Sequence, residues 1–346
     1  MEEISILFVG DSSYEMYVKA FYEAAKKLDN VKAKLIDFGK LNTSSSKDNL
    51  ALRFERHYRI GPHVLLVNNE IIKYVKNNRV DIVFLYACDI INASVVKKLS
   101  QLTYVAVYNN DNPFSSYYSK YMWKKVIASL KFADIVYSYR KSNIEQYKKA
   151  GAKKVKLLRS YYIKERNYYI PDEEIELEVP DVCFIGHHED DGRIEYIEAL
   201  LKKGIDVGVP EYWEKLGIKS EHLIYIKDSH KRYNEILNKT KIAIVFLSSI
   251  NEDTYTRRCF EIPVVKTLMI APKNSDIESM FDDGKEVVLY RSKEDLCDKV
   301  IYYLNHTELR DKIALSGYAR VIKDGYDVTD RVKEIISDYK SNNTNI

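Results

Sequence analysis

Short, wholly apolar runs alternate with amphipathic stretches along the chain, and this alternation most constrains the fold. Residues 4–9 (ISILFV), 81–86 (DIVFLY) and 103–108 (TYVAVY) are β-rich runs, each followed by a helical pattern. The alternation restarts after residue 180, with further apolar runs at 181–185 and 241–247. Strands that are apolar along their whole length are buried on both faces, as in parallel sheets covered by helices. The sequence therefore predicts an α/β protein with parallel sheets.

An acidic segment bounded by prolines, PDEEIELEVP, separates the two series of strands. A chain of 346 residues is long enough for two domains of ordinary size. We expect an N-terminal domain over residues 1–165, a linker over 166–180 and a C-terminal domain over 181–325. The last residues, 326–346, are predicted to form a helix followed by a disordered tail. A ligand is expected in the crevice between the domains, at the carboxyl ends of the strands.

The cysteines, the N-terminus and the apolar runs together indicate the compartment. The four cysteines are far apart and form no CxxC pair, which fits a reducing compartment without disulfides or a zinc ribbon. The chain starts with acidic residues and a strand, unlike a signal peptide. Its apolar runs are too short to span a bilayer. We expect a soluble, cytoplasmic protein, with peripheral contact to the inner face of the membrane as a further possibility.

The net charge of +3 hides an uneven distribution. Residues 1–165 carry 28 basic and 16 acidic residues, a balance of +12, and the remainder carries 26 basic and 35 acidic residues, a balance of −9. The basic half indicates an anionic partner: a membrane surface, a phosphate-bearing acceptor or nucleic acid. The alternative interpretation is a lysine-rich surface that only meets solvent.

Two polar loops follow strands of the first domain. Gly10, Asp11 and Ser12 lie between a strand and a helix, where the backbone can approach an anion or a hydroxyl-rich acceptor. They lack the further glycines of a dinucleotide fingerprint and the lysine of a P-loop. Asp111 follows another strand and could act as a base or bind a sugar hydroxyl. Both loops could also be simple turns.

The second domain also has polar loops that follow strands. Gly186 follows a strand and Arg193 starts a helix, a suitable arrangement for binding a diphosphate. The neighbouring histidines point in different directions and lack an HxxxH partner, so we expect no metal site there. In the cluster that begins at Asp253, Arg258 could hold a diphosphate and Glu261 the hydroxyls of a ribose. Alternatively, Arg258 and Glu261 pair with each other on a capped helix.

These motifs resemble those of the CgeB-like (spore-maturation-protein-B-like) glycosyltransferases, which are related to the retaining family 4 group. The resemblance rests on TRRCFEIP (256–263), FDDGKEVV (281–288), IALSGY (313–318) and DVCFIG (181–186) followed by Arg193. It also includes NDNP (110–113) and covers about residues 80–330.

The resemblance implies the GT-B fold, two Rossmann-like domains with parallel sheets facing a central cleft. The C-terminal domain would bind a nucleotide-sugar donor, with Glu261 on the ribose and Arg258, Arg193 and Gly186 at the diphosphate. Gly10, Asp11 and Ser12 would lie on the acceptor side. Asp253 stands where retaining relatives carry a glutamate, and we take it with Asp111 as a candidate catalytic residue. The final helix would cross back onto the first domain.

The leading hypothesis is a retaining, metal-independent glycosyltransferase. It would transfer a hexose from a nucleoside-diphosphate sugar, here UDP-hexose, and needs no cofactor besides this co-substrate. Its acceptor would be anionic: a cell-surface polysaccharide, a lipid-linked saccharide or modified DNA. Two alternatives remain open, a nucleotide-sugar epimerase of GT-B fold and a non-catalytic nucleotide- or saccharide-binding module.

Overall fold

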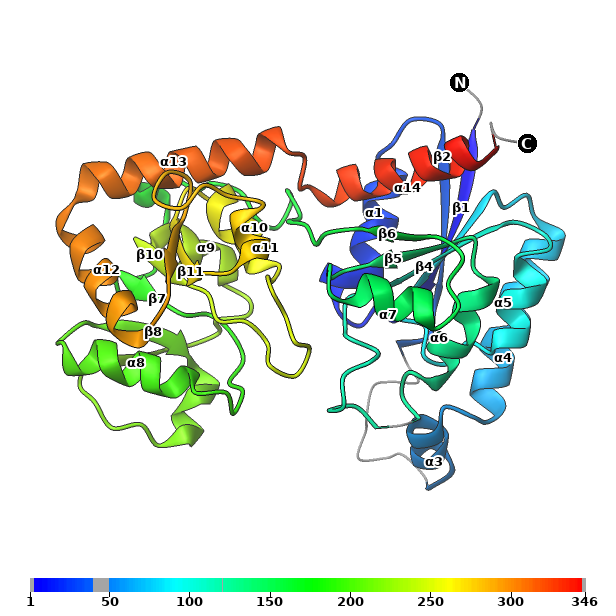
Figure 1. Cartoon of the computed structure of the whole chain (residues 1–346), viewed down its shortest axis with the longest axis horizontal. Helices are drawn as coiled ribbons and strands as arrows, with labels where there is room; N and C mark the ends of the chain where they lie inside the picture. Colours follow the sequence, from blue (N-terminus) through cyan, green and yellow to red (C-terminus); the bar gives the residue numbers. More distant parts are fainter. Residues whose placement is uncertain (1–2, 40–49, 120, 344–346) are drawn as a thin grey trace. The chain divides into compact units, whose positions relative to one another are not determined.

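The computed structural model describes residues 3–39, 50–119 and 121–343, and the chain divides into two compact α/β units (Figure 1). Unit 1 comprises Met1–Ser160 together with Val328–Ile346, and unit 2 comprises Tyr161–Asp327. Each unit contains one six-stranded sheet in which all neighbouring strands are parallel. The predicted α/β architecture with parallel sheets is confirmed.

The sheet of unit 1 has the order β2-β1-β3-β4-β5-β6. Its strands are β1 (Ile4–Gly10), β2 (Val31–Asp37), β3 (Ile82–Tyr86), β4 (Tyr104–Asn109), β5 (Ile135–Ser138) and β6 (Val155–Leu157). The chain passes from β1 to β2 on one side and then returns to place β3 on the other side. The carboxyl ends of β1 and β3 therefore flank the point where the strand order reverses, which is the usual ligand site of open α/β sheets.

Helices cover both faces of this sheet because its strands alternate their apolar side chains between two cores. Leu7 and Val9 pack in one core with residues of the helices on their face, whereas Phe8 contacts the ring of Phe84, with centroids 5.8 Å apart, on the other. On this second face α1 packs against α14. The helices are α1 (Ala20–Lys26), α3 (Leu50–Tyr58), α4 (Pro62–Asn77), α5 (Ala93–Leu99), α6 (Lys124–Ser129), α7 (Asn143–Lys149) and α14 (Val328–Asn343).

The sheet of unit 2 has the order β12-β11-β10-β7-β8-β9, so its reversal point lies between β7 and β10. Its strands are β7 (Val182–Cys183), β8 (Val207–Pro210), β9 (Leu223–Ile226), β10 (Ile242–Ile244), β11 (Leu268–Pro272) and β12 (Val288–Tyr290). Its helices are α8 (Arg193–Lys202), α9 (Tyr233–Lys239), α10 (Arg258–Val264), α11 (Ser275–Glu278), α12 (Lys293–Asn305) and α13 (Thr307–Lys323).

The segments expected to connect the domains have definite places. Residues 166–180, expected as a linker, belong to unit 2. The backbone of this segment is bound by α9, because the side-chain amides of Asn234 and Asn238 both donate to the carbonyl of Tyr168. Helix α14 belongs to unit 1, where Asp338 accepts a hydrogen bond from the hydroxyl of Tyr137 at 2.8 Å. The end of the tail for which disorder is expected, residues 344–346, lies outside the described residues.

No helix within the described ranges combines the length and the apolar character needed to cross a bilayer.

Candidate functional site

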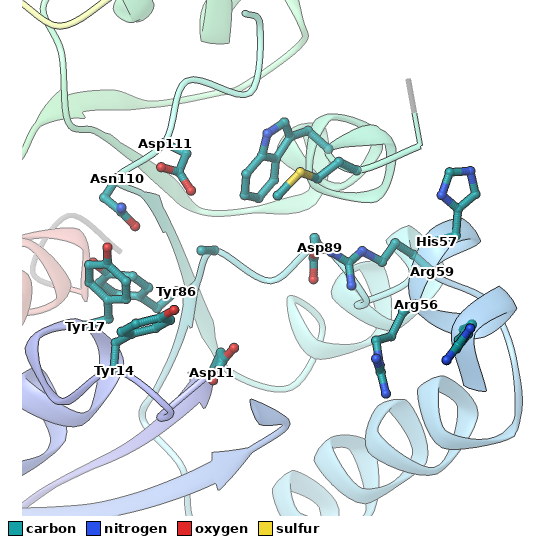
Figure 2. A pocket seen from close by; sticks show the side chains of 14 residues that line it. Asp11, Tyr14, Tyr17, Arg56, His57, Arg59, Tyr86, Asp89, Asn110 and Asp111 are labelled. Carbon is teal, nitrogen blue, oxygen red and sulfur yellow. Dashed lines mark ion pairs between the residues drawn. The ribbon is translucent and has the colours of Figure 1, made fainter. Parts of the chain in front are cut away.

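Polar side chains gather at the strand-order reversal of unit 1, where they line a cavity of about 590 Å³ (Figure 2). We call this cavity the unit-1 pocket. It lies where β1, β3 and β4 end. Its lining residues are Asp11, Tyr14, Tyr17, Arg53, Arg56, His57, Arg59, Tyr86, Ala87, Asp89, Asn110, Asp111, Met122 and Trp123.

The pocket brings together two of the residues singled out in the sequence. Asp11 follows β1 and Asp111 follows β4, and both line the cavity, although 100 residues of sequence separate them. Gly10 and Ser12 are not among its described lining residues. A Cβ on Gly10 would lie 2.8 Å from Cβ of Val18, so this glycine serves the packing of the following helix against the strand. The N–H of Ser12 donates to Asp37 at 2.9 Å.

The strongest electrostatic feature of the pocket is a buried ion pair. Asp89 is only 3% exposed, and one of its carboxylate oxygens lies 2.9 Å from the guanidinium of Arg59. Burial raises the pKa of Asp89 to about 6, although the positive charges of Arg59 and Lys125 oppose the rise. Asp11 adds to the rise through its own negative charge. This carboxyl group therefore titrates close to neutral pH.

Among the buried polar atoms of the lining, Oδ1 of Asp89 and Nε1 of Trp123 have no hydrogen-bond partner in the described part of the chain. Buried polar groups in folded proteins are nearly always paired, with protein, water or ligand. Here the acceptor is a carboxylate and the donor is an indole N–H, the pair of functions that a hydroxyl group satisfies. A ligand rich in hydroxyl groups fits this chemistry.

Aromatic rings form one wall of the pocket. The ring of Tyr17 stacks on that of Tyr86, with ring centroids 5.9 Å apart (Figure 2). The ring centroids of Tyr14 and Tyr17 are 5.6 Å apart. Such rings offer apolar faces to the C–H surface of a ligand and hydroxyl groups to its polar edge. Ala87, beside Tyr86, has a φ of 48°, a left-handed conformation that non-glycine residues rarely adopt. Strain of this kind is concentrated at binding sites.

The opposite wall comes from a helix that the sequence reasoning did not assign. Arg53, Arg56 and His57 lie on α3, and Arg59 follows it directly. Its sequence carries a helical signal, since Leu50, Phe54 and Tyr58 recur at every fourth residue. The run of basic and aromatic residues RFERHYR is a further signal at this segment.

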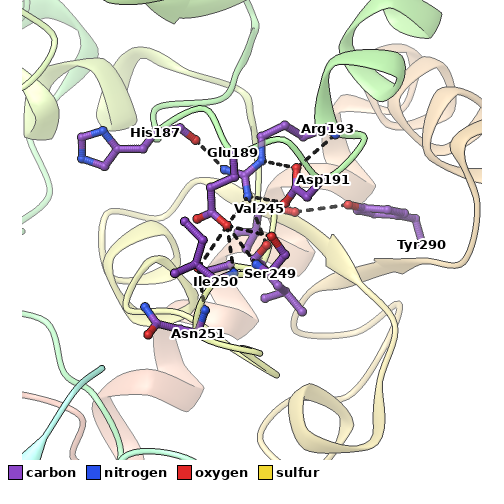
Figure 3. A network of polar contacts seen from close by, with 11 residues as sticks. His187, Glu189, Asp191, Arg193, Val245, Ser249, Ile250, Asn251 and Tyr290 are labelled. Atoms are coloured by element: carbon purple, nitrogen blue, oxygen red, sulfur yellow. Dashed lines mark hydrogen bonds and ion pairs between the residues drawn. The ribbon is translucent and has the colours of Figure 1, made fainter. Parts of the chain in front are cut away.

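In unit 2, a polar network occupies the reversal point between β7 and β10 (Figure 3). Arg193, the first residue of α8, is 4% exposed and lies at its centre. Its guanidinium donates to Asp191 at 2.7 and 2.5 Å, to the carbonyl of Leu247 at 3.2 Å and to the carbonyl of His187. Arg193 thus ties the loop after β7 to the chain after β10. In this arrangement it positions the loop rather than offering its charge to a ligand.

A second residue of the same loop reinforces this tie. The carboxylate of Glu189 accepts hydrogen bonds from the N–H of Ser249 at 2.9 Å and from the hydroxyls of Ser248 and Ser249 at 3.1 and 3.2 Å. A nest of N–H and O–H donors such as this one suits an anion. Here the carboxylate of Glu189 itself occupies this group of donors.

Arg258 and Gly186 lie against each other beside this network. The Nε of Arg258 donates to the carbonyl of Ile185 at 2.8 Å, and a Cβ on Gly186 would lie 3.0 Å from its Nη2. Gly186 thus allows the guanidinium to approach the end of β7 closely. Partial burial, and after it the charge of Arg258, lower the pKa of His187. The structure thus brings together two of the residues that the sequence analysis assigned to the donor site.

Glu261 is buried in α10 and its partner is Tyr233 of α9. The Tyr233 hydroxyl donates to the Glu261 carboxylate at 2.9 Å, and burial together with this carboxylate raises the pKa of Tyr233 well above its usual range. The structure gives no ion pair between Arg258 and Glu261 among the described residues, which was the alternative interpretation of this motif.

Asp253 lies in the loop that follows β10, where its N–H donates to the carbonyl of Ser248 at 2.8 Å. Within the described part of the chain, no three His, Cys, Asp or Glu side chains are arranged to hold a metal ion.

Comparison with known proteins agrees with this architecture. Residues 193–337 match a family described as glycosyl transferase-like. This segment begins at Arg193 and contains Asp253, Arg258 and Glu261. No curated protein matches the chain.

Solved structures match over nearly the whole length. HepE of Anabaena, in complex with UDP and glucose, has a TM-score of 0.69 at 12% identity and covers 98% of this chain and 100% of its own. Sucrose-phosphate synthase of Thermosynechococcus elongatus has a TM-score of 0.72 at 10% identity, with coverage of 99% and 100%. A putative UDP-N-acetylglucosamine 2-epimerase of Listeria monocytogenes has a TM-score of 0.61 at 13% identity, with coverage of 99% and 98%. At these identities the similarity establishes the fold, and the predicted GT-B fold is confirmed.

Proposed function

We propose that this chain is a glycosyltransferase that moves a hexose from a UDP-hexose to a hydroxyl group of an acceptor. The observation that carries this proposal is the match of residues 193–337 to the glycosyl transferase-like family, since this segment supplies both Arg258 and Glu261. The fold shared with HepE, whose structure holds UDP and glucose, supports UDP as the nucleotide. Within the glycosyltransferases, the motifs of the chain resemble those of the CgeB-like group, and we place it there.

On the donor side, Glu261 would accept the ribose hydroxyls and Arg258 would neutralise the diphosphate as it leaves. Gly186 would let the diphosphate approach the end of β7, in the same way as it admits Arg258. Arg193 would act by holding the loop after β7, because its donors are already bound by Asp191 and two carbonyls. A guanidinium fixed in advance can stabilise a leaving diphosphate without a metal. We therefore propose a metal-independent reaction with the nucleotide sugar as the sole co-substrate.

On the acceptor side, the unit-1 pocket would bind the hydroxyl-bearing substrate. Asp89 and Trp123 offer it a buried acceptor and a buried donor, and the tyrosines offer it stacking surfaces. Asp111, on the same lining, would orient the reacting hydroxyl. Asp253 would lie on the donor side, at the place where retaining relatives carry a glutamate, and we propose retention of the anomeric configuration. We propose that the reaction takes place in the cytoplasm.

A thermal-unfolding screen with UDP, GDP, ADP and their sugars tests the donor site. A ligand that binds only the folded state raises the melting temperature. We expect UDP to raise that of the wild type, and to raise those of Glu261→Gln and Arg258→Gln much less. Arg291→Gln, at an exposed arginine of the same unit, is the matched control and should respond as the wild type does.

The products then separate the three candidate activities. Transfer of the hexose to an added acceptor, with release of UDP, supports a transferase, and the anomeric configuration of the product reports on retention. Conversion of one UDP-sugar into another without release of UDP would favour an epimerase. The putative epimerase of Listeria has the same fold as this chain. Binding of UDP without any turnover, even with added acceptors, would favour the binding module. A wild type that no nucleotide stabilises would refute the assignment of the donor site.

A further inference from the structure

Exposed apolar side chains gather around α3 in unit 1. Leu50 is 83% exposed, Leu66 65% and Tyr117 67%, although such side chains are usually buried. Figure 1 shows α3 at the N-terminal end of α4, at the margin of unit 1. We call this surface the α3 patch; it consists of the exposed residues Leu50, Phe54, Tyr58, Ile60, Leu65, Leu66, Tyr117 and Tyr121. Exposed apolar side chains that lie together mark an interaction site.

The patch is an organised surface rather than a set of isolated side chains. Leu50, Phe54 and Tyr58 are spaced four residues apart on α3 and therefore lie on one face of the helix. The ring centroids of Phe54 and Tyr58 are 4.4 Å apart, and those of Tyr58 and Tyr121 are 5.2 Å apart. The aromatic contacts join α3 to the segment that precedes α6.

The charges around the patch are almost all positive. Residues 49–69 contain a single acidic residue, Glu55, and residues 112–133 contain none, whereas Glu70, one turn after Leu66 on α4, is exposed. Glu55 is buried, and its carboxylate accepts hydrogen bonds from His63 and from the N–H of Val64, both at 2.8 Å. The exposed positive side chains include Arg53 and Lys124. The surface therefore combines apolar side chains with charges that are predominantly positive.

We propose that the α3 patch docks on an anionic lipid bilayer. Leucine, phenylalanine and tyrosine side chains insert into the interface between headgroups and acyl chains, and neighbouring arginines and lysines bind anionic headgroups. Nucleic acid explains the charges of this surface but gives no reason to expose Leu50, Leu65 and Leu66. A bilayer accounts for both properties.

The position of the patch also indicates where the acceptor comes from, an extension that rests on the proposed function. Arg53, Arg56 and His57 lie on α3 and line the unit-1 pocket as well. A docked α3 would therefore hold the mouth of the pocket at the level of the headgroups. An acceptor whose hydroxyl groups stand on a membrane lipid could then reach Asp89 and Trp123 without leaving the bilayer.

Sedimentation of the full-length protein with vesicles tests the docking. The vesicles contain phosphatidylcholine alone or phosphatidylcholine with phosphatidylglycerol. We expect binding to the second kind only, weakened by added salt because exposed charges are screened. Leu50→Ser/Phe54→Ser should lower the affinity about tenfold or more, since each buried apolar side chain contributes strongly. The matched control, Leu315→Ser/Ile322→Ser, removes two exposed apolar side chains of α13 and should bind as the wild type does.

The outcomes separate this proposal from the glycosyltransferase proposal. Leu50 and Phe54 lie outside both candidate sites, so UDP should stabilise the double variant as much as the wild type, which also shows that it folds. Vesicle binding without any response to UDP would support docking and count against the donor site. No vesicle binding, or equal binding by both double variants, would overturn the docking proposal. It would also be overturned if an oligonucleotide binds in place of vesicles, or if the α3 variant only converts a dimer into a monomer.

Discussion

Asp89 is the carboxyl group of unit 1 whose surroundings conflict most with its charge. Because burial raises its folded-state pKa to about 6, the folded protein holds this proton more tightly than the unfolded chain, whose value is about 3.9. An acid with a raised pKa stabilises the fold at low pH and loses that contribution as the pH rises. The loss builds up between about pH 4 and pH 6 and amounts to about 3 kcal/mol above it.

Asp89→Asn removes this titration, and we expect the stability of the wild type to fall relative to the variant as the pH rises from 4 to 7. Urea unfolding at several pH values measures the difference. Loss of the ion pair with Arg59 offsets the two curves by a constant amount above pH 6 but does not remove their divergence below it. Asp29→Asn, at an exposed position of the same unit, is the matched control. Parallel curves for Asp89→Asn would contradict the prediction.

At the scale of single residues, the sequence could indicate which side chains carry chemistry but not how they are engaged. Gly186, Arg193 and Arg258 were selected because they follow strands, and the structure places all three at the reversal point of unit 2. That Arg193 is bound by Asp191 depends on how the loop folds back. Asp89 could not be found from sequence, because its burial and its contact with Arg59 join segments 30 residues apart.

At the scale of elements, Gly317 decides how closely α13 approaches the rest of unit 2. A Cβ at this position would lie 2.3 Å from the backbone carbonyl oxygen of Glu286, a contact that no side-chain rotation can relieve. Gly317 belongs to the IALSGY motif, and this close approach gives the motif a structural reason.

We expect Gly317→Ala to destabilise unit 2 by about 1–3 kcal/mol, since overpacking forces backbone shifts of this cost. The helix propensity of alanine would by itself stabilise the fold, so the sign of the effect is diagnostic. Ser316→Ala, at the half-buried position next to it on α13, is the control and should change stability little. Chemical unfolding followed by circular dichroism measures both. A stabilised Gly317→Ala would show that α13 can move without loss.

The elements themselves were predictable to different degrees. Wholly apolar runs such as β1, β3 and β4 stand out because both faces of a parallel sheet are buried. The sequence of residues 117–131 by itself predicts one helix, but α6 spans only Lys124–Ser129. Tyr117 and Tyr121 instead belong to the exposed surface beside α3. Apolar residues at helical spacing predict a helix with one buried face. The prediction fails at Tyr117 and Tyr121, which are exposed.

At the scale of the whole molecule, each unit has its own hydrophobic core and its own candidate site. The chain has two tryptophans, and they divide between the units. Trp123 lines the unit-1 pocket. Trp213 is buried in unit 2, where its Nε1–H donates to the carbonyl of Gly186 at 3.0 Å. Each tryptophan is thus a natural fluorescent reporter of one unit and of one candidate site.

Trp123→Phe leaves Trp213 as the reporter, and Trp213→Phe leaves Trp123. UDP stabilises only what it binds, so it should raise the unfolding midpoint reported by Trp213 more than that reported by Trp123. Each variant is compared with itself, with and without UDP, so that loss of the Trp213 hydrogen bond cancels. Equal shifts in both reporters would show instead that the two units unfold as one cooperative body. The same pair of variants then shows whether an added acceptor raises the unfolding midpoint reported by Trp123 more than that reported by Trp213.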